Sequence, residues 1–198
     1  MKVEFEALIF DCDGTLVLTA DLHFAAIGAA LAAQGAVLKR GWYEARTGLG
    51  RRDLMAALGQ DLGMALDVDR AEAESIALTL TSAADVAREN PPVVALARRY
   101  HGRMPMAVAT NAEAPVVRAV LDGVGLRGLF DPVVSLTEAG RAKPDPAMFL
   151  MAAAAMGMPP ARCLVLEDSA QGLTAAAAAG CPALDVRRAA DLAILARL

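Results

Sequence analysis

Cysteines, basic clusters and long apolar runs are scarce in this 198-residue chain, and each scarcity excludes a class of protein. Cys12, Cys163 and Cys181 are its three cysteines, and their spacing fits neither a zinc site nor a disulfide framework. The chain has 19 Lys and Arg against 23 Asp and Glu, which gives a formal net charge of -4. Because proteins hold a phosphate backbone through a basic patch, and the sequence has none, we expect no nucleic-acid partner.

The uncharged stretches are too short to cross a membrane. The longest of them, such as residues 147–161, are interrupted by Gly or Pro and fall below the length of a membrane span. The first residues carry acidic side chains and run directly into a predicted strand, which is not the pattern of a signal peptide. We therefore expect no membrane partner and a cytoplasmic location.

The residues that are abundant favour a compact globular protein. Hydrophobic residues make up 56% of the chain and charged residues 21%, which argues against disorder. Much of the apolar excess is alanine, a strong helix former. The length allows one large core with a small accessory domain.

Five short apolar runs predict the strands of a parallel sheet. They cover residues 5–10, 105–110, 133–136, 163–167 and 183–186. Helical patterns separate the last four runs, at residues 115–123, 146–156 and 171–179. Strands that alternate with helices predict an α/β fold with a doubly wound parallel, Rossmann-like sheet.

The connection after the first strand departs from this alternation. No convincing strand is recognisable from residue 17 to about residue 90, where helical patterns cover residues 20–34, 52–62 and 69–87. This connection is too long for one crossover, so we predict a small all-helical cap at residues 18–84. Residues 1–17 and 85–198 then form the sheet domain, and Pro91-Pro92 marks the return to it, since the second proline disfavours helix at the first.

The sequence has four polar clusters at or just after the ends of apolar runs, and the first cluster is acidic. Asp11 and Asp13 come directly after the first strand and precede a glycine turn, at a spacing that places both on one face of a continuing strand. The other clusters are Thr110-Asn111, Lys143-Pro144-Asp145-Pro146 and Glu167-Asp168-Ser169. Any one of them alone is typical of a turn or a helix cap. Since open parallel sheets bind ligands at the carboxyl ends of their strands, we expect one site that the cap covers as a lid.

These clusters resemble the four motifs of the haloacid dehalogenase-like hydrolases. The residues that carry the resemblance are Asp11-Cys12-Asp13-Gly14-Thr15-Leu16, Thr110, Lys143-Pro144 and Glu167-Asp168. The predicted helical insert is similar to the cap of the β-phosphoglucomutase-like branch. Within that branch, residues 100–108 and 164–169 are most similar to small sugar-phosphate phosphatases of the fructose-1-phosphate phosphatase type. The resemblance covers essentially the whole chain.

This resemblance implies a phosphatase that works through an aspartyl-phosphate intermediate. Asp11 would be the nucleophile. Asp13 would act first as general acid and then as general base, a role that suits a pKa raised above its usual value by desolvation. Lys143 would pair with Asp11 and the phosphate. Mg²⁺ would be held by Asp168 with Glu167 beside it, by Asp11, and by the backbone carbonyl of Asp13.

Four further residues would bind a small phosphorylated substrate. Thr110 would donate a hydrogen bond to a phosphoryl oxygen, helped by the backbone N–H of Asn111. Arg51, in the loop at residues 47–52, would meet the distal groups of the substrate, and His23 would lie near Asp13. Two alternatives remain open here: Arg51 as an exposed arginine at a helix start, and His23 as a structural histidine.

Two other functions compete with hydrolysis. A phosphomutase of the same branch usually carries a lysine just before the loop glycine, whereas here Thr47 precedes Gly48, and residues 75–81 contain no basic side chain. A cap poor in cations fits poorly with the two phosphates of a mutase intermediate. The third alternative is a catalytically silent binding protein. For the assembly we expect a monomer or a weak homo-oligomer.

Overall fold

A computed structural model describes residues 5–46, 48–195 and 197 of the chain. The strands are β1 Ala7–Phe10, β2 Val17–Leu18, β3 Arg88–Glu89, β4 Met106–Ala109, β5 Val133–Val134, β6 Cys163–Glu167 and β7 Ala183–Asp185. The helices are α1 Ala20–Ala32, α2 Arg40–Glu44, α3 Arg51–Leu62, α4 Val68–Val86, α5 Pro91–Tyr100, α6 Ala114–Gly123, α7 Leu136–Ala139, α8 Ala147–Ala155, α9 Ala170–Ala179 and α10 Ala189–Leu195, with 3-10 turns at Arg127–Leu129 and Pro160–Arg162.

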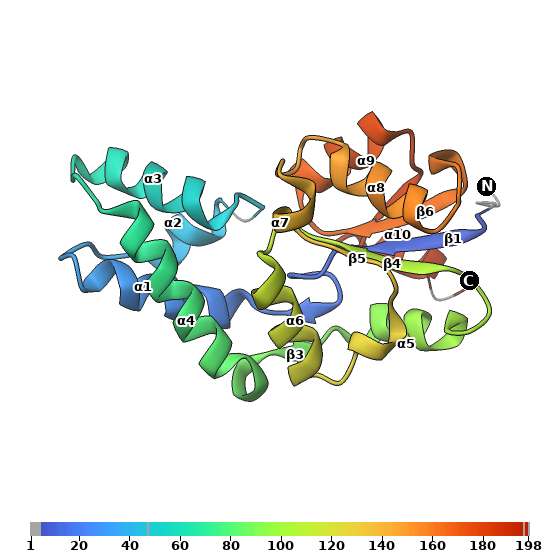
Figure 1. The fold of residues 1–198 in the computed structure, drawn as a ribbon, viewed down its shortest axis with the longest axis horizontal. Coiled ribbons are helices and arrows are strands. Elements are labelled where there is room, and N and C mark those ends of the chain that lie inside the picture. The colour runs from blue at the N-terminus through green and yellow to red at the C-terminus, as the bar shows by residue number, and fades with distance from the viewer. Residues whose placement is uncertain (1–4, 47, 196, 198) are drawn as a thin grey trace.

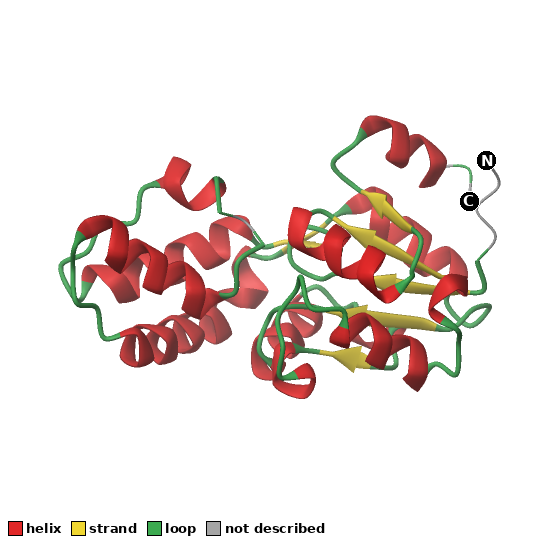
Figure 2. Cartoon of the chain, turned by 90° about the horizontal axis from the view of Figure 1, so that it is seen from above, coloured by secondary structure: helices red, strands yellow, loops and turns green. Residues whose placement is uncertain are grey.

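A parallel sheet forms the centre of the part of the molecule that lies on the right in Figure 2. Its strand order is β5-β4-β1-β6-β7, and Ile9 of β1 lies opposite Ala107 of β4 and Val165 of β6. All four residues of β1 are buried, as expected for a central strand covered on both faces. The predicted α/β fold with a doubly wound parallel sheet is confirmed.

Alternate side chains of each strand enter two different cores. Leu8 and Phe10 pack with residues of α5 and α6 on one face, whereas Ile9 packs with Met148 and Phe149 of α8 on the other. Figure 1 shows α8 and α9 on one side of the strands and α5 on the opposite side. The near-continuous apolar strands of the sequence are therefore a consequence of helices on both faces.

The helices α1 to α4 lie beside one end of the sheet (Figure 1). They have an apolar cluster of their own, which includes Ile27, Leu31, Met55 and Leu58. The chain enters and leaves this helical insert through β2 and β3, which pair antiparallel with Val17 opposite Glu89. The insert expected at residues 18–84 corresponds to these four helices, and α4 continues to Val86. The domain boundaries at 18 and 84 remain a prediction.

Several elements differ from the sequence prediction. The expectation of no strand between residues 17 and 90 was wrong, because β2 and β3 exist but have two residues each, too few to give an alternating pattern. The strand predicted at residues 133–136 ends earlier, since Ser135 caps α7 and forms a capping box with Glu138. The sequence prediction also lacked α2, α5, α7 and α10.

The expectation that Pro92 would keep Pro91 out of a helix was also wrong. α5 begins at Pro91, with Asn90 as its N-cap and prolines in its first turn. The first turn of a helix has no partner for its backbone N–H groups, so proline is tolerated there. Among all the helices in the described part of the chain, none is both long and apolar enough to cross a bilayer.

Candidate active site

One pocket gathers the site residues that the sequence predicted. Asp11 follows β1, Thr110 follows β4, and Asp168 follows β6, so the parallel sheet brings their side chains to one edge. The insert adds residues from α1 and from the start of α3. The predicted residues that line this pocket are Asp11, Asp13, His23, Arg51, Thr110, Asn111, Lys143, Glu167 and Asp168.

Lys143 lies at the bottom of the site between two carboxylates. Its Nζ donates to Asp11 Oδ1 at 2.6 Å and to Glu167 Oε2 at 2.7 Å. All three residues are buried. Burial alone would lower the pKa of Lys143, but Asp11 and Glu167 together raise it above its usual value. Lys143 therefore stays protonated and supplies one positive charge to this group of acids.

Glu167 is held by four hydrogen bonds. Its Oε2 accepts from Lys143, while Oε1 accepts from the backbone N–H of Asp168 and from the backbone N–H and hydroxyl of Ser169. A Cβ on Gly172 would lie 2.0 Å from Glu167 Cδ, so α9 needs glycine there to leave room for the carboxylate. Both Glu167 oxygens are occupied, which suits a residue that orients Lys143.

Asp168 packs against the turn that follows β1. Thr15 Oγ1 donates to Asp168 Oδ1 at 3.1 Å. Gly14 has a φ of +87°, and a Cβ there would lie 2.2 Å from Asp168 Oδ2. Burial and then the charge of Glu167 raise the pKa of Asp168 to about 6. The glycine of the first motif therefore permits close approach of the turn to this carboxylate.

The crowding of acids fits a divalent cation. Ligand oxygens of Asp11, Glu167 and Asp168 lie within 4.8 Å of one another. Burial, Glu167 and Asp168 raise the pKa of Asp11 well above its usual range, against the effect of Lys143. Three carboxylates with one lysine are short of positive charge, and carboxylate oxygens are the protein ligands that Mg²⁺ prefers. The role expected for the backbone carbonyl of Asp13 remains a prediction.

Asp13 is an ionised carboxylate in this arrangement. Thr19 Oγ1 donates to its Oδ1 at 2.7 Å, and His23 Nε2 lies 2.8 Å from the same oxygen. Burial alone would raise the pKa of Asp13, but the charge and hydrogen bond of His23, the hydroxyl of Thr19 and the charge of Arg51 hold it at about 2. The expected rise in this pKa was wrong, because desolvation is outweighed by donors and positive charge.

Thr110 and Asn111 form the wall next to Lys143. Thr110 Oγ1 accepts from the backbone N–H of Ala112 at 3.1 Å, which leaves its own hydroxyl hydrogen for a ligand. The side chain of Asn111 accepts from the backbone N–H of Lys143 at 2.8 Å, and it donates to the carbonyl of Gly48 at 3.3 Å. Asn111 therefore links the Lys143 loop to the insert.

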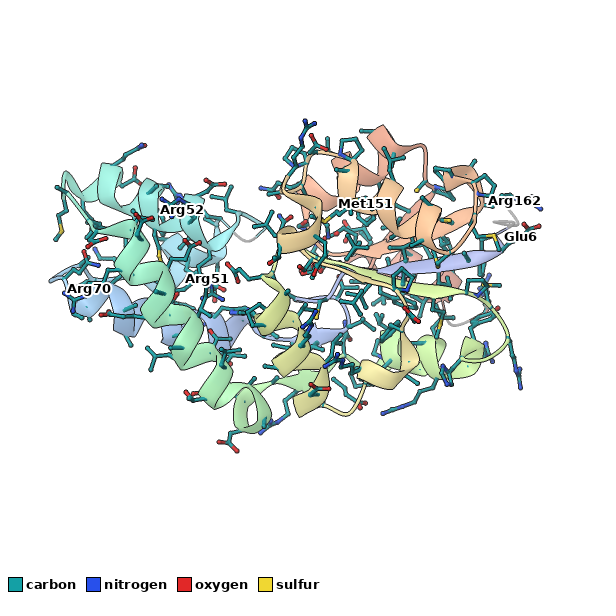
Figure 3. The ribbon with its side chains drawn as sticks, viewed as in Figure 1. Glu6, Arg51, Arg52, Arg70, Met151 and Arg162 are labelled. Carbon is teal, nitrogen blue, oxygen red and sulfur yellow. The ribbon has the colours of Figure 1, made fainter. Side chains whose placement is uncertain are left out.

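Arg51 points from the insert into the same pocket. In Figure 3, Arg70 lies at the end of the insert farthest from the sheet, and Arg51 lies between that end and the sheet domain. Arg51 Nε lies 3.5 Å from Glu113 Oε1, and its Nη1 donates to Ser75 Oγ at 3.1 Å. The side chain is 6% exposed, so the alternative of an exposed arginine is wrong. Thr47 lies outside the described residues. It is the residue that stands where the phosphomutases of this branch usually carry a lysine.

Four residues of the site were absent from the sequence prediction. Thr15, Thr19, Ser75 and Glu113 each contact a predicted site residue. Thr19 lies four residues before His23 at the start of α1, and Glu113 lies two residues after Asn111. Those positions were recognisable as neighbours of motifs. Their contacts were not, since each joins segments that are brought together only by the packing of the fold.

Comparisons with known proteins agree with this geometry. The sequence profile of the haloacid dehalogenase-like hydrolases matches residues 5–180. Fructose-1-phosphate phosphatase YqaB of Escherichia coli (strain K12) is 34% identical over 201 residues, which cover 94% of this chain and 99% of that protein. Protein CbbY of Rhodobacter capsulatus is 32% identical, with 90% of this chain and 83% of that protein covered.

A solved structure extends the comparison to a ligand complex. The crystal structure of an aspartate-to-asparagine mutant of CbbY from Rhodobacter sphaeroides, in complex with xylulose-(1,5)bisphosphate, superposes with a TM-score of 0.82. It shares 27% sequence identity, over 91% of this chain and 85% of that chain. With the profile match over most of its length, the chain belongs to the haloacid dehalogenase-like hydrolases.

Proposed function

We propose that this protein is a Mg²⁺-dependent phosphatase that hydrolyses a small sugar phosphate through a phosphoryl group carried on Asp11. The observation that carries the proposal is Lys143, whose Nζ lies 2.6 Å from Asp11 and 2.7 Å from Glu167 beside the third acid, Asp168. This arrangement keeps Asp11 next to a fixed positive charge and next to a group of oxygens suited to a cation. Both features serve to bring a phosphate dianion up to a carboxylate nucleophile.

In the first step, the Asp11 oxygen that Lys143 does not contact attacks phosphorus. The bond from phosphorus to the sugar oxygen breaks, and the sugar oxygen takes a proton from Asp13. Thr110 donates its hydroxyl hydrogen to a phosphoryl oxygen, and Lys143 balances the charge of the nucleophile. Asp13 is ionised without substrate, so the negative charge of a phosphate beside it has to raise its pKa before it can donate.

In the second step, water replaces the sugar. The oxygen of the water attacks phosphorus while Asp13 accepts a proton from this water. The bond from the Asp11 oxygen to phosphorus then breaks, and inorganic phosphate leaves. The ionised form of Asp13 is the form required here. Its contacts with Thr19 and His23 are both at Oδ1, so Oδ2 is the oxygen that would exchange the proton.

Asp11 and Asp168 would hold Mg²⁺, with Glu167 beside them. When bound, the ion supplies positive charge that neutralises the repulsion between the Asp11 carboxylate and a dianionic phosphate. The fit rests on the clustered oxygens of these residues; burial, and after it the charge of Glu167, raises the pKa values of Asp11 and Asp168.

The relatives give two candidate classes of substrate. A sugar monophosphate is the first, because the relative with 34% identity is named as a fructose-1-phosphate phosphatase and is covered over 99% of its length. A sugar bisphosphate is the second, because CbbY was crystallised with xylulose-(1,5)bisphosphate. The same panel of substrates tests both classes and also the alternative of a phosphomutase, which would isomerise a sugar phosphate without net release of phosphate.

The test is release of inorganic phosphate from sugar monophosphates, sugar bisphosphates and acetyl phosphate, each with Mg²⁺ and with EDTA. We expect release that needs Mg²⁺ and that falls by roughly 10⁴-fold or more in Asp11→Asn, since loss of a nucleophile costs about this much in hydrolases. Asp122→Asn, an exposed aspartate paired with Arg127, is the matched control and should keep full activity. Equal, low release by the wild type and Asp11→Asn would indicate a silent protein, and isomerisation without release would indicate a mutase.

A further inference from the structure

Two residues that line the pocket each have a buried charged-group atom without a hydrogen-bond partner. Within the described residues, Arg51 Nε and Glu113 Oε2 are the buried side-chain nitrogen and oxygen atoms that make no hydrogen bond. The Arg51 and Glu113 side chains are 6% and 17% exposed. Their nearest approach, 3.5 Å from Nε to Oε1, is an ion pair without hydrogen-bond geometry. Both residues line the same pocket as Asp11 and Lys143.

The remaining atoms of Arg51 are already occupied. Nη1 donates to Ser75 Oγ at 3.1 Å, and Nη2 lies 3.4 Å from His23 Nδ1. These contacts fix the guanidinium, and Nε is its one nitrogen without a hydrogen-bond partner. Leaving a buried donor and a buried acceptor unpaired costs free energy, and a bound ligand removes that cost if it offers one group of each kind. A hydroxyl does so, since it accepts from Nε and donates to Oε2.

The charges at this end of the pocket argue against an anion. A lone buried arginine would suit a phosphate, which it binds through paired N–H donors. Here Glu113 lies 3.5 Å from Arg51 and offsets its charge. A second phosphate bonded to Arg51 Nε would also lie next to the Glu113 carboxylate, 3.5 Å away, and like charges brought together in a buried site are strongly unfavourable. The pair therefore fits an uncharged group rich in hydroxyls.

The pair also spans the two parts of the molecule. Arg51 comes from the start of α3 in the insert, whereas Glu113 precedes α6 in the sheet domain. Nearby, the carbonyl of Gly48 accepts from Asn111 across the same boundary. A group that bonds to both Arg51 and Glu113 is thus held only while the insert is docked on the sheet domain.

We propose that Glu113 and Arg51 together bind the hydroxyls of an uncharged sugar or polyol leaving group and disfavour substrates with a second phosphate. The proposal rests on the phosphatase function above and assigns its substrate class. Glu113 acts here as a specificity residue: it accepts a hydrogen bond from the leaving group and repels an anion at the same place.

The test compares kcat/KM for a monophosphate and a bisphosphate of the same sugar, fructose 1-phosphate with fructose 1,6-bisphosphate and glucose 1-phosphate with glucose 1,6-bisphosphate. Wild-type protein should prefer the monophosphate in at least one pair. Glu113→Gln should reduce that preference by roughly 10-fold or more, because the amide oxygen still accepts a hydrogen bond but no longer carries the charge that strengthens it and repels an anion. Glu74→Gln, whose glutamate pairs with Arg70 on the insert, should leave the preference unchanged.

Each outcome decides the proposal. A wild type that hydrolyses the bisphosphates as well as the monophosphates overturns it, even if Glu113→Gln does not fold. A folded Glu113→Gln with an unchanged preference also overturns it. Release of phosphate from acetyl phosphate but from no sugar phosphate overturns the substrate class and leaves the phosphatase chemistry intact. Release from none of these compounds overturns the proposed function as well.

Discussion

At the scale of single residues, Lys143 decides the charge balance of the site. It is the cation that contacts both Asp11 and Glu167, and all three side chains are buried. Removal of one partner from a buried ion pair leaves an uncompensated charge, which destabilises a protein more than the intact pair stabilises it. The site thus depends on Lys143 for stability as well as for chemistry.

Lys143→Met tests this dependence. We expect its free energy of unfolding in EDTA to fall by about 3–5 kcal/mol, because two buried carboxylates lose their cation, and Mg²⁺ should restore part of the loss. Urea unfolding with EDTA and with Mg²⁺ measures both effects. Lys39→Met, at an exposed position before α2, is the control. A Lys143→Met protein as stable as the wild type in EDTA would contradict this account of the site.

Asp13 is the second residue whose role can be isolated. With p-nitrophenyl phosphate the leaving group departs without protonation, so Asp13→Asn should form the phosphorylated intermediate and then hydrolyse it slowly. We expect a burst of p-nitrophenolate and a steady-state rate lower by about 10²–10⁴-fold, the usual contribution of a general base. Stopped-flow absorbance records both phases. A slow rate without a burst would mean that the substitution slows phosphoryl transfer to Asp11 itself, and it would contradict the role of Asp13 as the general base of the second step.

At the scale of helices and strands, two helical glycines differ in the space around them: one is tightly packed and the other is open. A Cβ on Gly172 in α9 would lie 2.0 Å from Glu167 Cδ, whereas a Cβ on Gly28 in α1 would meet nothing within 4 Å. Gly28→Ala should stabilise the protein by about 0.5–1 kcal/mol, the difference in helix propensity. Gly172→Ala should destabilise it and lower phosphate release, since Glu167 has to move. Thermal unfolding and activity distinguish the two, and equal shifts in both variants would contradict the packing described for Glu167.

The strands and the residues at their ends were predictable from the sequence, whereas contacts of the insert were not. The strands around Ile9 and Val165 were recognisable because burial on both faces makes them almost wholly apolar. The acids that follow them were predicted to meet, since parallel strands end at one edge. The contacts β2 with β3 and Arg51 with Glu113 were not predictable, because each joins segments whose pairing depends on how the insert packs. The low pKa of Asp13 likewise depends on contacts with α1.

At the scale of the whole molecule, the insert is docked over the pocket. Gly48 has a φ of +95°, and a Cβ there would lie 2.5 Å from Gln171 Oε1 and 2.9 Å from Ser169 Cβ in the sheet domain. The loop before α3 therefore approaches the start of α9 as closely as the backbone allows. This contact closes the pocket next to Asp168 and Glu167.

Gly48→Ala should hold the insert away from the sheet domain. We expect kcat/KM for the preferred sugar phosphate to fall by roughly 10-fold or more, since small displacements of positioning groups have effects of this size. Gly35→Ala is the matched control: Gly35 also has a positive φ, at +79°, but a Cβ there meets nothing within 4 Å. It should lose stability and keep its kcat/KM. Equal losses of kcat/KM in both variants would show that backbone strain, and not docking, causes the effect.

The central claim, that Asp11 carries the phosphoryl group, is tested most directly by trapping it. Wild-type protein is mixed with Mg²⁺ and its best sugar phosphate, quenched in acid within milliseconds, digested and analysed by mass spectrometry. We predict a phosphoryl group on the peptide that contains Asp11, removable by hydroxylamine and absent from Asp11→Asn. Rapid release of phosphate by the wild type, with no phosphoryl group on that peptide either in the wild type or in Asp13→Asn mixed with p-nitrophenyl phosphate, would contradict the account.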